Sequence, residues 1–407
     1  MPETVPLDQA WLCVIGIGED GLDGLSRVAR ARLDEAEIVA GGRRHLDLAA
    51  SLGKQEFAWG VPFADSIPQL LALRGRKVVV LASGDPFWHG VGAVLAEHVP
   101  ASEMSVIPNV STFGWAASRL RWRLEECVTL GLHSRPLALL RPHLRPGARL
   151  IVLLRDAAAL GELATLMGEF GFGPSQVTTL EALGGPRERL RTLRADECGG
   201  IEACAPLAVG ILALAEPGAR IIPLSSGLPD EYFESDGQLT KREIRAMTIS
   251  SLAPRGGELL WDIGAGAGSI GIEWLLAHPG NRAVAIEERP DRLERVGRNA
   301  DALGVPHLLL RQGSAPEALQ GLPRPDAVFV GGGATAPGLM DAIWEALPDG
   351  GRLVVNGVTL ETEALLLARQ ARHGGALLRI AITRASPVGD MQGWRPAMPV
   401  MQWSVVK

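Results

Sequence analysis

A carboxylate followed by three closely spaced glycines provides the clearest chemistry in this chain. Asp262 ends an apolar run, and Gly264, Gly266 and Gly268 follow it at alternate positions. Glycines allow the backbone to approach a ligand closely, and the free amides at a helix N-terminus attract polar ligand atoms. Glu287 ends the next apolar run, where a carboxylate can accept hydrogen bonds from ribose hydroxyls. These residues predict a loop that binds a nucleoside.

Two kinds of nucleoside fit such a loop. Gly266, Gly268 and Gly271 form the G-x-G-x-x-G pattern of dinucleotide sites, but an NAD site normally has an apolar residue where this chain has Asp262. The string D-x-G-x-G-x-G resembles the loop of class I methyltransferases, which bind S-adenosyl-L-methionine. "GSAPEAL" (313–319) strengthens the resemblance, because the third strand of that fold turns over the adenine there. The alternative without a ligand is a plain strand-to-helix turn.

A second glycine loop lies near the start of the chain. Gly16, Gly18 and Gly21 follow the apolar run 11–17 and again form G-x-G-x-x-G. The next apolar run, "AEIVAGG", ends in glycines at the place where an NAD site needs its ribose carboxylate. The pattern therefore disfavours NAD in this half too.

Three further stretches resemble the tetrapyrrole methylase family. They are "LASGDPFWHGVG" (81–92), "VIPNVST" (106–112) and "GGRRHLDL" (41–48), of which the last is typical of the branch that methylates precorrins in cobalamin synthesis. The resemblance implies two α/β subdomains with S-adenosyl-L-methionine between them. Glu19 stands where many relatives have proline, which argues against direct ligand contact by the early glycines.

The same resemblance assigns methyl-donor binding in this half to the G-D-P loop and to a serine–threonine turn. The residues so assigned are Gly84, Asp85, Pro86, Ser111 and Thr112. Ser111 and Thr112 are also residue types that cap helices. Asp85 followed by Pro86 is a common turn pair in its own right, so an ordinary turn is the alternative.

Both halves together are similar, over nearly the full length, to the family of decarboxylating precorrin-6Y methyltransferases. "GLPDEYF" (227–233) followed by "LTKREIR" (239–245) resembles the entry segment of the smaller half in that family. The resemblance implies one S-adenosyl-L-methionine site per domain. In the smaller half it assigns donor binding to Thr240, Gly264, Ala265, Gly266, Ala267, Gly268, Glu287 and Ala315.

The resemblance also implies a reaction. Two methyl groups go to carbons 5 and 15 of the precorrin macrocycle, and the acetate on ring C loses carbon dioxide; the smaller half methylates carbon 15 and decarboxylates, and the larger half methylates carbon 5. The macrocycle supplies its own nucleophilic carbons and electron sink, so no metal or further cofactor is needed. The sequence identifies no catalytic residue, no general acid, no order of steps and no state of cobalt in the ring.

Five side chains are candidates for contact with the substrate. They are His89, Arg119, Tyr232, Arg245 and Arg395. Arginines match the geometry of substrate carboxylates, although Arg119 also fits a solvated helix face. Tyr232, the only tyrosine, could donate a proton or simply pack, and His89 fits an exposed loop equally well.

Composition excludes several classes of function. The chain has 407 residues, 47% of them hydrophobic and 21% charged, as in folded soluble proteins, and its net charge of −6 creates no field that would gather nucleic acid. "VFVGGGATAPG" (328–338) leaves open space for a bulky acceptor where DNA methylases carry a polar clamp. The four cysteines, Cys13, Cys127, Cys198 and Cys204, lack metal-site spacing.

The first 21 residues contain no signal or membrane segment, so we expect a cytoplasmic protein without a membrane partner.

The elements that must position these residues are short apolar runs alternating with helical patterns, which predict an α/β protein with parallel sheets. We expect a tetrapyrrole methylase domain at 1–215, a linker or lid at 216–239, and a Rossmann-like class I methyltransferase domain at 240–407. Residues 240–254 predict a helix with Thr240 as its N-cap and Pro254 at its end. No helix separates the last two apolar runs, so we expect an antiparallel edge strand.

Two other functions remain open from the sequence. The chain could methylate another conjugated small molecule at a single site, or its amino-terminal half could be a non-catalytic module that senses S-adenosyl-L-methionine. Titration of S-adenosylhomocysteine into each separated half tests them: one site in total favours these alternatives, and two sites favour two catalytic halves. Self-association through the carboxy-terminal domain is expected by resemblance alone.

Overall fold

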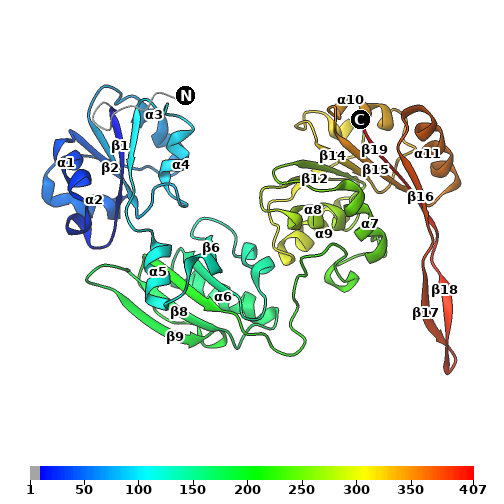
Figure 1. The fold of residues 1–407 in the computed structure, drawn as a ribbon, viewed down its shortest axis with the longest axis horizontal. Helices are drawn as coiled ribbons and strands as arrows, with labels where there is room; N and C mark the ends of the chain where they lie inside the picture. The colour runs from blue at the N-terminus through cyan, green and yellow to red at the C-terminus, as the bar shows by residue number, and fades with distance from the viewer. Residues whose placement is uncertain (1–9) are drawn as a thin grey trace. The chain divides into compact units, whose positions relative to one another are not determined.

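The computed structural model describes residues 10–407 and divides into two compact units (Figure 1). The first comprises the chain up to residue 137 and residues 143–220, and the second comprises 138–142 and 221–407. The linker or lid role of 216–239 stays a prediction, but Leu228 and Phe233 of this segment are buried in the core of the second unit. The expectation that the first 21 residues contain no signal or membrane segment falls partly on residues 1–9, which lie outside the described residues.

The first unit begins with a fully parallel sheet, as the sequence predicts. Its strand order is β3-β2-β4-β1-β5. The central strands β1 and β4 are apolar and almost completely buried, as expected for a sheet covered on both faces. The bounds are β1 (Leu12–Ile17), α1 (Arg27–Glu35), β2 (Ile38–Gly41), α2 (Arg43–Ala49), β3 (Gln55–Ala58), α3 (Ser66–Leu71), β4 (Val78–Ser83), α4 (Val91–Ala96) and β5 (Met104–Ile107).

The second sheet of this unit is mixed, so the expectation of parallel sheets throughout is wrong. Its order is β6-β7-β10-β8-β9, and only β6 and β7 pair in parallel. Helix α6 connects β7 to β8, but β10 inserts antiparallel between them, and β9 follows β8 through a short loop without a helix. The bounds are α5 (Thr112–Leu120), β6 (Cys127–Gly131), β7 (Arg149–Leu154), α6 (Ala157–Glu169), β8 (Gln176–Glu181), β9 (Arg189–Arg194) and β10 (Leu207–Leu212).

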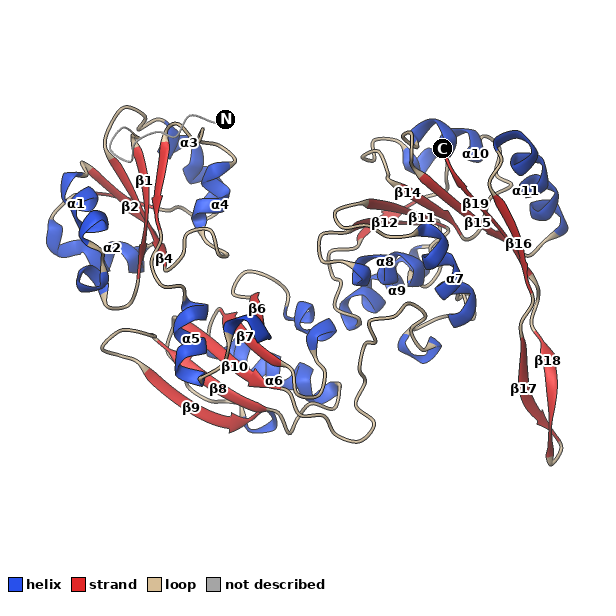
Figure 2. Cartoon of the chain, viewed as in Figure 1, coloured by secondary structure: helices blue, strands red, loops and turns tan. Residues whose placement is uncertain are grey.

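The second unit has a seven-stranded Rossmann-like sheet (Figure 2). Its order is β13-β12-β11-β14-β15-β19-β16, and the first five strands are parallel. The predicted antiparallel pairing of the last strands is confirmed for β16 and β19. β19 is not the edge strand, however, because it lies between β15 and β16, and β16 forms the edge. The bounds are β11 (Leu259–Ile263), β12 (Arg282–Glu287), β13 (Leu309–Gln312), β14 (Ala327–Val330), β15 (Arg352–Gly357), β16 (Ala376–Ile380) and β19 (Val400–Val406).

The helices of this unit are α7 (Arg242–Leu252), α8 (Ser269–Ala277), α9 (Pro290–Ala302), α10 (Leu339–Ala346) and α11 (Leu360–His373). Helix α7 ends just before Pro254, as predicted. Its start differs from the prediction, because Lys241 rather than Thr240 is the N-cap. The Thr240 carbonyl instead accepts a hydrogen bond from Arg245.

A separate two-stranded hairpin, β17 (Thr383–Val388) and β18 (Met391–Pro396), extends from the end of β16 (Figure 2). The sequence analysis did not anticipate it. Its strands are short and largely exposed, so they lack the alternation that would reveal a half-buried strand.

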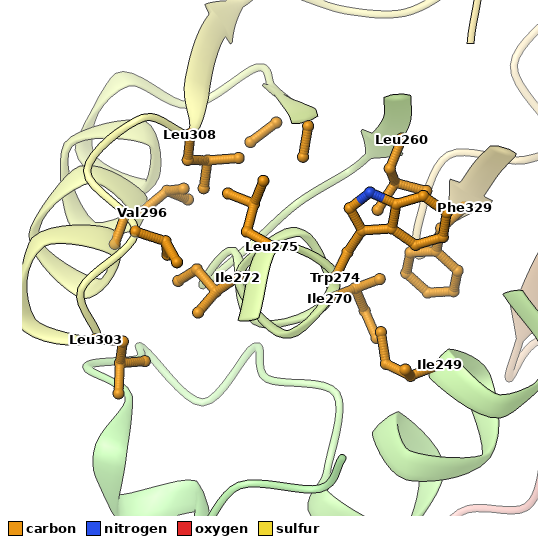
Figure 3. Packing of buried hydrophobic residues seen from close by; sticks show 14 of the residues in the cluster. Ile249, Leu260, Ile270, Ile272, Trp274, Leu275, Val296, Leu303, Leu308 and Phe329 are labelled. Atoms are coloured by element: carbon orange, nitrogen blue, oxygen red, sulfur yellow. The ribbon is translucent and has the colours of Figure 1, made fainter. Parts of the chain in front are cut away.

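Helix α8, which follows the glycine loop, is buried on nearly all sides (Figure 3). Ile272, Trp274 and Leu275 pack with Val296 of α9 and with Leu308. Apart from the buried Glu273, the large side chains of α8 are apolar, as expected for a helix in a core, and this burial fixes the point where the glycine loop enters the helix. No helix within residues 10–407 combines the length and apolar character needed to cross a membrane.

Candidate functional site

A cavity of about 820 Å³ opens in the second unit. It lies at the carboxyl ends of β11, β12, β14 and β15, where open α/β sheets bind ligands. Its lining includes the glycine loop 264–266, Glu287 and 313–315. It also includes 331–334, 356–359 and the base of the β17–β18 hairpin. The cavity therefore brings the predicted donor residues together with the glycines that follow β14.

The glycine loop presents bare backbone to this cavity. Gly264 and Gly266 have φ angles of +70° and +60°, a conformation that favours glycine. A Cβ added to Gly264 would lie 3.0 Å from the Gly332 amide nitrogen, and one added to Gly266 would lie 3.2 Å from the Gln238 carbonyl oxygen. Glycine at these positions permits the close approach of neighbouring backbone, and both residues also line the cavity.

Glu287 is fixed beside the loop at the end of β12. Its Oε2 accepts a hydrogen bond from the Gly266 amide at 2.9 Å, and its Oε1 accepts one from the Arg289 amide at 3.1 Å. The side chain is 6% exposed and lines the cavity. Its remaining lone pairs are oriented in advance to accept hydrogen bonds from ribose hydroxyls.

Asp262 lies beneath the loop and is 1% exposed. Its Oδ2 accepts a hydrogen bond from the Gly271 amide at 2.9 Å, while Oδ1 is buried and has no partner among the described residues. Burial raises the pKa of Asp262 to about 7, and the neighbouring Glu287 also raises it. A buried oxygen without a partner costs on the order of 1–3 kcal/mol.

Six of the eight donor residues predicted for this unit line the cavity: Thr240, Gly264, Ala265, Gly266, Glu287 and Ala315. Ala267 and Gly268 are not among the lining residues. Ala267 is buried, and its carbonyl accepts a hydrogen bond from Asn299. Gly268 is the N-cap of α8 and packs against Val296. These two residues shape the helix start instead.

The predicted role of Arg245 in substrate binding is wrong. Arg245 is 0% exposed. Its Nε donates to Glu273 Oε1 at 2.5 Å, and its other nitrogens donate to the carbonyls of Leu228 and Thr240. A charge so deeply buried needs a partner, and Glu273 on α8 provides it. Arg245 thus anchors the segment before α7.

Tyr232 and Arg395 also lie outside the cavity lining. The Tyr232 hydroxyl donates to the Ile221 carbonyl at 3.2 Å, and its ring packs against the core. These contacts match the packing role rather than proton donation to a substrate. Arg395 lies in β18 directly opposite Arg384 of β17. Arg384 lines the cavity, and the sequence analysis missed it because the hairpin was not recognised.

Two of the three consecutive glycines border open space, whereas Gly331 packs against Phe329. A Cβ added at Gly332 or Gly333 would meet no atom within 4 Å. Asn356 at the end of β15 also lines this region. Its amide donates to Thr248 at 3.0 Å and accepts from buried Gln402 at 2.9 Å. The sequence gives no sign of this network, because its members come from three distant elements.

The candidate site of the first unit lies where the loops after β1, β4 and β5 meet. The Gly84 amide donates to the Ile17 carbonyl at 3.1 Å, and the Asn109 amide donates to the Gly84 carbonyl at 3.0 Å. A Cβ added to Gly16 would lie 1.8 Å from the Gly84 carbonyl oxygen. Gly16 is therefore required for close backbone packing, in agreement with the interpretation that it makes no direct ligand contact.

A pocket of about 40 Å³ adjoins these loops and is lined in part by Gly84 and Thr112. Ordinary ligand sites are several times larger. Glu19, which also lines it, is nearly buried and forms ion pairs with Arg44 and with Arg187, the latter at 3.1 Å. The carboxylate at the position of the usual proline thus ties the β1 loop to the β8–β9 loop.

The other predicted residues of this unit have local partners. Ser111 is the N-cap of α5 and accepts from the Gly114 amide at 3.0 Å, which confirms the capping prediction, and Thr112 is the first helical residue. Asp85 Oδ1 accepts from the Phe87 amide at 2.9 Å, as in an ordinary turn, and Pro86 follows it in the chain. These bonds hold the loops in place.

The two substrate candidates of the first unit are also engaged. Arg119 donates to both carboxylate oxygens of Glu188, at 2.5 and 3.1 Å, and lies 4.9 Å from the Trp115 ring centre. It is therefore occupied by a structural ion pair rather than free for a substrate. The His89 ring lies 5.8 Å from the Phe113 ring. Its pKa is lowered mainly by burial and also by the positive charge of nearby Arg135.

Within residues 10–407, no group of three or more His, Cys, Asp or Glu side chains is placed to hold a metal ion.

Comparisons with known proteins cover both units. A family model described as tetrapyrrole (corrin/porphyrin) methylases matches residues 12–198, and one described as a precorrin methyltransferase domain matches residues 231–407. A precorrin-6Y C(5,15)-methyltransferase (decarboxylating) from a Sinorhizobium species is 53% identical over 98% of this chain and 96% of that protein. A protein of the same name from Mycobacterium tuberculosis is 39% identical over 97% of this chain and 100% of that protein.

A solved domain structure is among those similar to this chain. It is the crystal structure of the C-terminal domain of precorrin-6Y C5,15-methyltransferase from Rhodobacter capsulatus, which is 50% identical. The match covers 46% of this chain and 100% of that chain, with a TM-score of 0.44.

Proposed function

The chain belongs to the family of the decarboxylating precorrin-6Y C(5,15)-methyltransferases, and we propose that it methylates carbons 5 and 15 of a precorrin and removes carbon dioxide from the acetate on ring C. It is thus a methyltransferase enzyme of cobalamin biosynthesis. The identity of 53% over almost the whole chain with a protein of that name is the observation that carries the proposal. Both methylase models match in the expected order, 12–198 before 231–407.

Each unit holds one molecule of S-adenosyl-L-methionine, which supplies a methyl group bound to a positively charged sulfur. In the second unit, the support is the glycine loop with Gly264 and Gly266, which lines the cavity, and the fixed carboxylate of Glu287 beside it. Thr240 and Ala315 line the same cavity. In the first unit, Gly84, Asp85, Pro86, Ser111 and Thr112 hold the donor.

The second unit carries the carbon 15 methylation and the decarboxylation. Methyl transfer from a sulfonium requires alignment of donor and acceptor carbon and exclusion of water. The glycine loop and the open glycines 332–333 line the same cavity of about 820 Å³, which supports binding of donor and acceptor side by side. Apolar side chains also line this cavity, Phe329 and Ile382 among others, and keep water away from the reacting carbon.

The first unit carries the carbon 5 methylation. Its pocket of about 40 Å³ is too small for the donor, so the donor enters as the loops around Glu19 separate. The ion pair between Glu19 and Arg187 is the contact that must break. Glu19 keeps its ion pair with Arg44 when Arg187 leaves, so its nearly buried carboxylate is not left without a partner.

The protein works in the cytoplasm, without a nucleic acid or membrane partner, as a homo-oligomer associated through its carboxy-terminal domain. Support for association comes from the β17–β18 hairpin, where Val388, Met391 and Trp394 are highly exposed. An isolated two-stranded hairpin is only marginally stable in water, and a second copy packed on these side chains would stabilise it.

Mass spectrometry of the product tests the proposal directly. The full chain is incubated with precorrin-6Y and S-adenosyl-L-methionine. We expect the product to gain two methyl groups and to lose one carbon dioxide. A product with one added methyl group, or with its carboxylate count unchanged, would contradict it.

A sensor role for the first unit is the second candidate, because Glu19 and its two arginines occupy the space around the small pocket. A sensor would bind S-adenosylhomocysteine but leave carbon 5 unmethylated. Calorimetric titration of the full chain with S-adenosylhomocysteine, combined with the product mass, separates the two functions: two sites and two added methyl groups support two catalytic units.

A further inference from the structure

Three basic residues line the cavity of the second unit, and their partners differ. They are Lys241, Arg292 and Arg384. Arg292 donates to Asp236 at 2.8 Å and, as the main cause, lowers the pKa of that carboxyl to about 2. Lys241 lies 3.8 Å from Asp230, which also pairs with buried Arg245. Arg384 alone of the three pairs with a carboxylate that belongs to no larger network.

That partner is Glu243, on the first turn of α7. The side chains of Arg384 and Glu243 are 44% and 46% exposed. An ion pair that remains in contact with water contributes little to stability. Arg384 can therefore exchange Glu243 for another carboxylate at small cost, whereas Arg245 cannot leave its buried partner.

A second arginine adds positive charge at the same place. Arg395 lies directly opposite Arg384 in the antiparallel register of β17 and β18. Residues in this relation have Cβ atoms about 4.5–5.5 Å apart on one face of the ribbon, and like charges so placed repel each other. Arg395 forms no ion pair with any described residue. Glu243 thus pairs with Arg384 alone, and the charge of Arg395 beside it has no carboxylate partner among the described residues.

We propose that Arg384, supported by Arg395, binds a peripheral carboxylate of the macrocycle and releases Glu243 as it does so. The inference rests on the proposed function, because a precorrin is a flat ring with carboxylate side chains. Arg384 reaches the cavity from the β17–β18 hairpin rather than from the glycine loop, and we assign it to the acceptor rather than to the methyl donor. A guanidinium matches a carboxylate in a bidentate manner, which would fix the rotation of the ring in the cavity.

Substitutions of the two partners distinguish this role from a structural ion pair, because their effects should have opposite signs. Arg384→Ala should weaken precorrin-6Y binding about tenfold, since a hydrogen bond to a charged group is lost. Glu243→Gln should strengthen it about two- to fivefold, because the competing carboxylate is neutralised. If the pair only stabilised the fold, both variants would weaken binding or neither would change it.

The measurement is the absorbance change of precorrin-6Y on titration into the full chain with S-adenosylhomocysteine present, so that no methyl transfer occurs. Arg379→Ala is the matched control: Arg379 lies at the same edge in β16, is 3.9 Å from Glu363 and does not line the cavity. Its affinity should be unchanged. Binding of S-adenosylhomocysteine itself should be equal in all variants, which checks that the donor site is intact.

The outcomes separate the two proposals. Opposite shifts for Arg384→Ala and Glu243→Gln support the inference. Unchanged precorrin-6Y affinity in Arg384→Ala, with normal binding by the parent chain, overturns the inference and leaves the proposed function standing. Failure of the parent chain to bind precorrin-6Y overturns both.

Discussion

Replacement of Asn299 by alanine should weaken the donor site without touching any residue that lines it. The Asn299 side chain on α9 is buried and makes three hydrogen bonds to backbone. Its Oδ1 accepts from the Glu234 amide at 2.8 Å, and its Nδ2 donates to the carbonyls of Glu234 and Ala267 at 3.0 and 2.9 Å. Asn299 therefore ties the segment before α7 to the glycine loop.

The size of the effect follows from these bonds. Each neutral hydrogen bond contributes about 0.5–1.5 kcal/mol, so the three together contribute roughly 1.5–4.5 kcal/mol. The glutamate–arginine pair of Glu273 and Arg245 still holds the segment in the variant, so only part of this appears as lost affinity. We expect the affinity for S-adenosylhomocysteine in the second unit to fall about tenfold, which corresponds to about 1.4 kcal/mol.

Isothermal titration of the full chain measures the affinity, and hydrogen exchange at the Glu234 amide reports whether the segment has loosened. Arg298→Ala is the control, because Arg298 also contacts Glu234 but through an exposed ion pair; its affinity should be unchanged. If the Glu234 amide exchanges faster in Asn299→Ala while the affinity stays at the parent value, the segment does not position the donor site and the reasoning is refuted.

Two further predictions concern stability. Asp262 has a folded pKa of about 7, above its unfolded value of about 3.9. Because only the folded state holds the proton between these values, the free energy of unfolding should fall as pH rises from about 4 to about 7. Urea unfolding at several pH values measures this slope, and Asp262→Asn should abolish most of it. An equal slope in the variant would contradict the assignment. Gly268→Ala should lower the free energy of unfolding by about 2–3 kcal/mol, because φ is +76° and the new Cβ would lie 2.6 Å from Val296 Cγ1. Gly257→Ala is the control, because φ is +88° and a new Cβ would meet no atom within 4 Å. It should lower the free energy of unfolding only by the cost of the left-handed backbone conformation, about 1–2 kcal/mol. Equal losses in the two variants would show that the Val296 contact is unimportant.

Local patterns predicted the parts of the site that depend on neighbours in sequence. The glycine loop follows a buried strand and opens a helix, and Glu287 ends the next strand beside it, so their meeting follows from the parallel order of β11 and β12. Ser111 caps α5 because its partner is only three residues away. These features need no knowledge of long-range contacts.

Features that depend on distant partners were missed or misread. Arg245 resembles a surface arginine in sequence, and only its buried bond to Glu273, 28 residues later, makes it a core residue. Insertion of β10 between β7 and β8 brings together strands separated by helix and loop, so periodicity does not reveal its direction. Arg384 enters the cavity through the pairing of an exposed hairpin that lacks apolar alternation.

Product analysis of Glu287→Ala tests most directly the claim that two separate donor sites act in one chain. Glu287 belongs to the second unit alone and contacts the glycine loop. With precorrin-6Y and S-adenosyl-L-methionine, mass spectrometry and NMR should show a product methylated at carbon 5 that retains its ring C acetate. Equal loss of both methylations in a variant that is folded would contradict the division of labour between the two units.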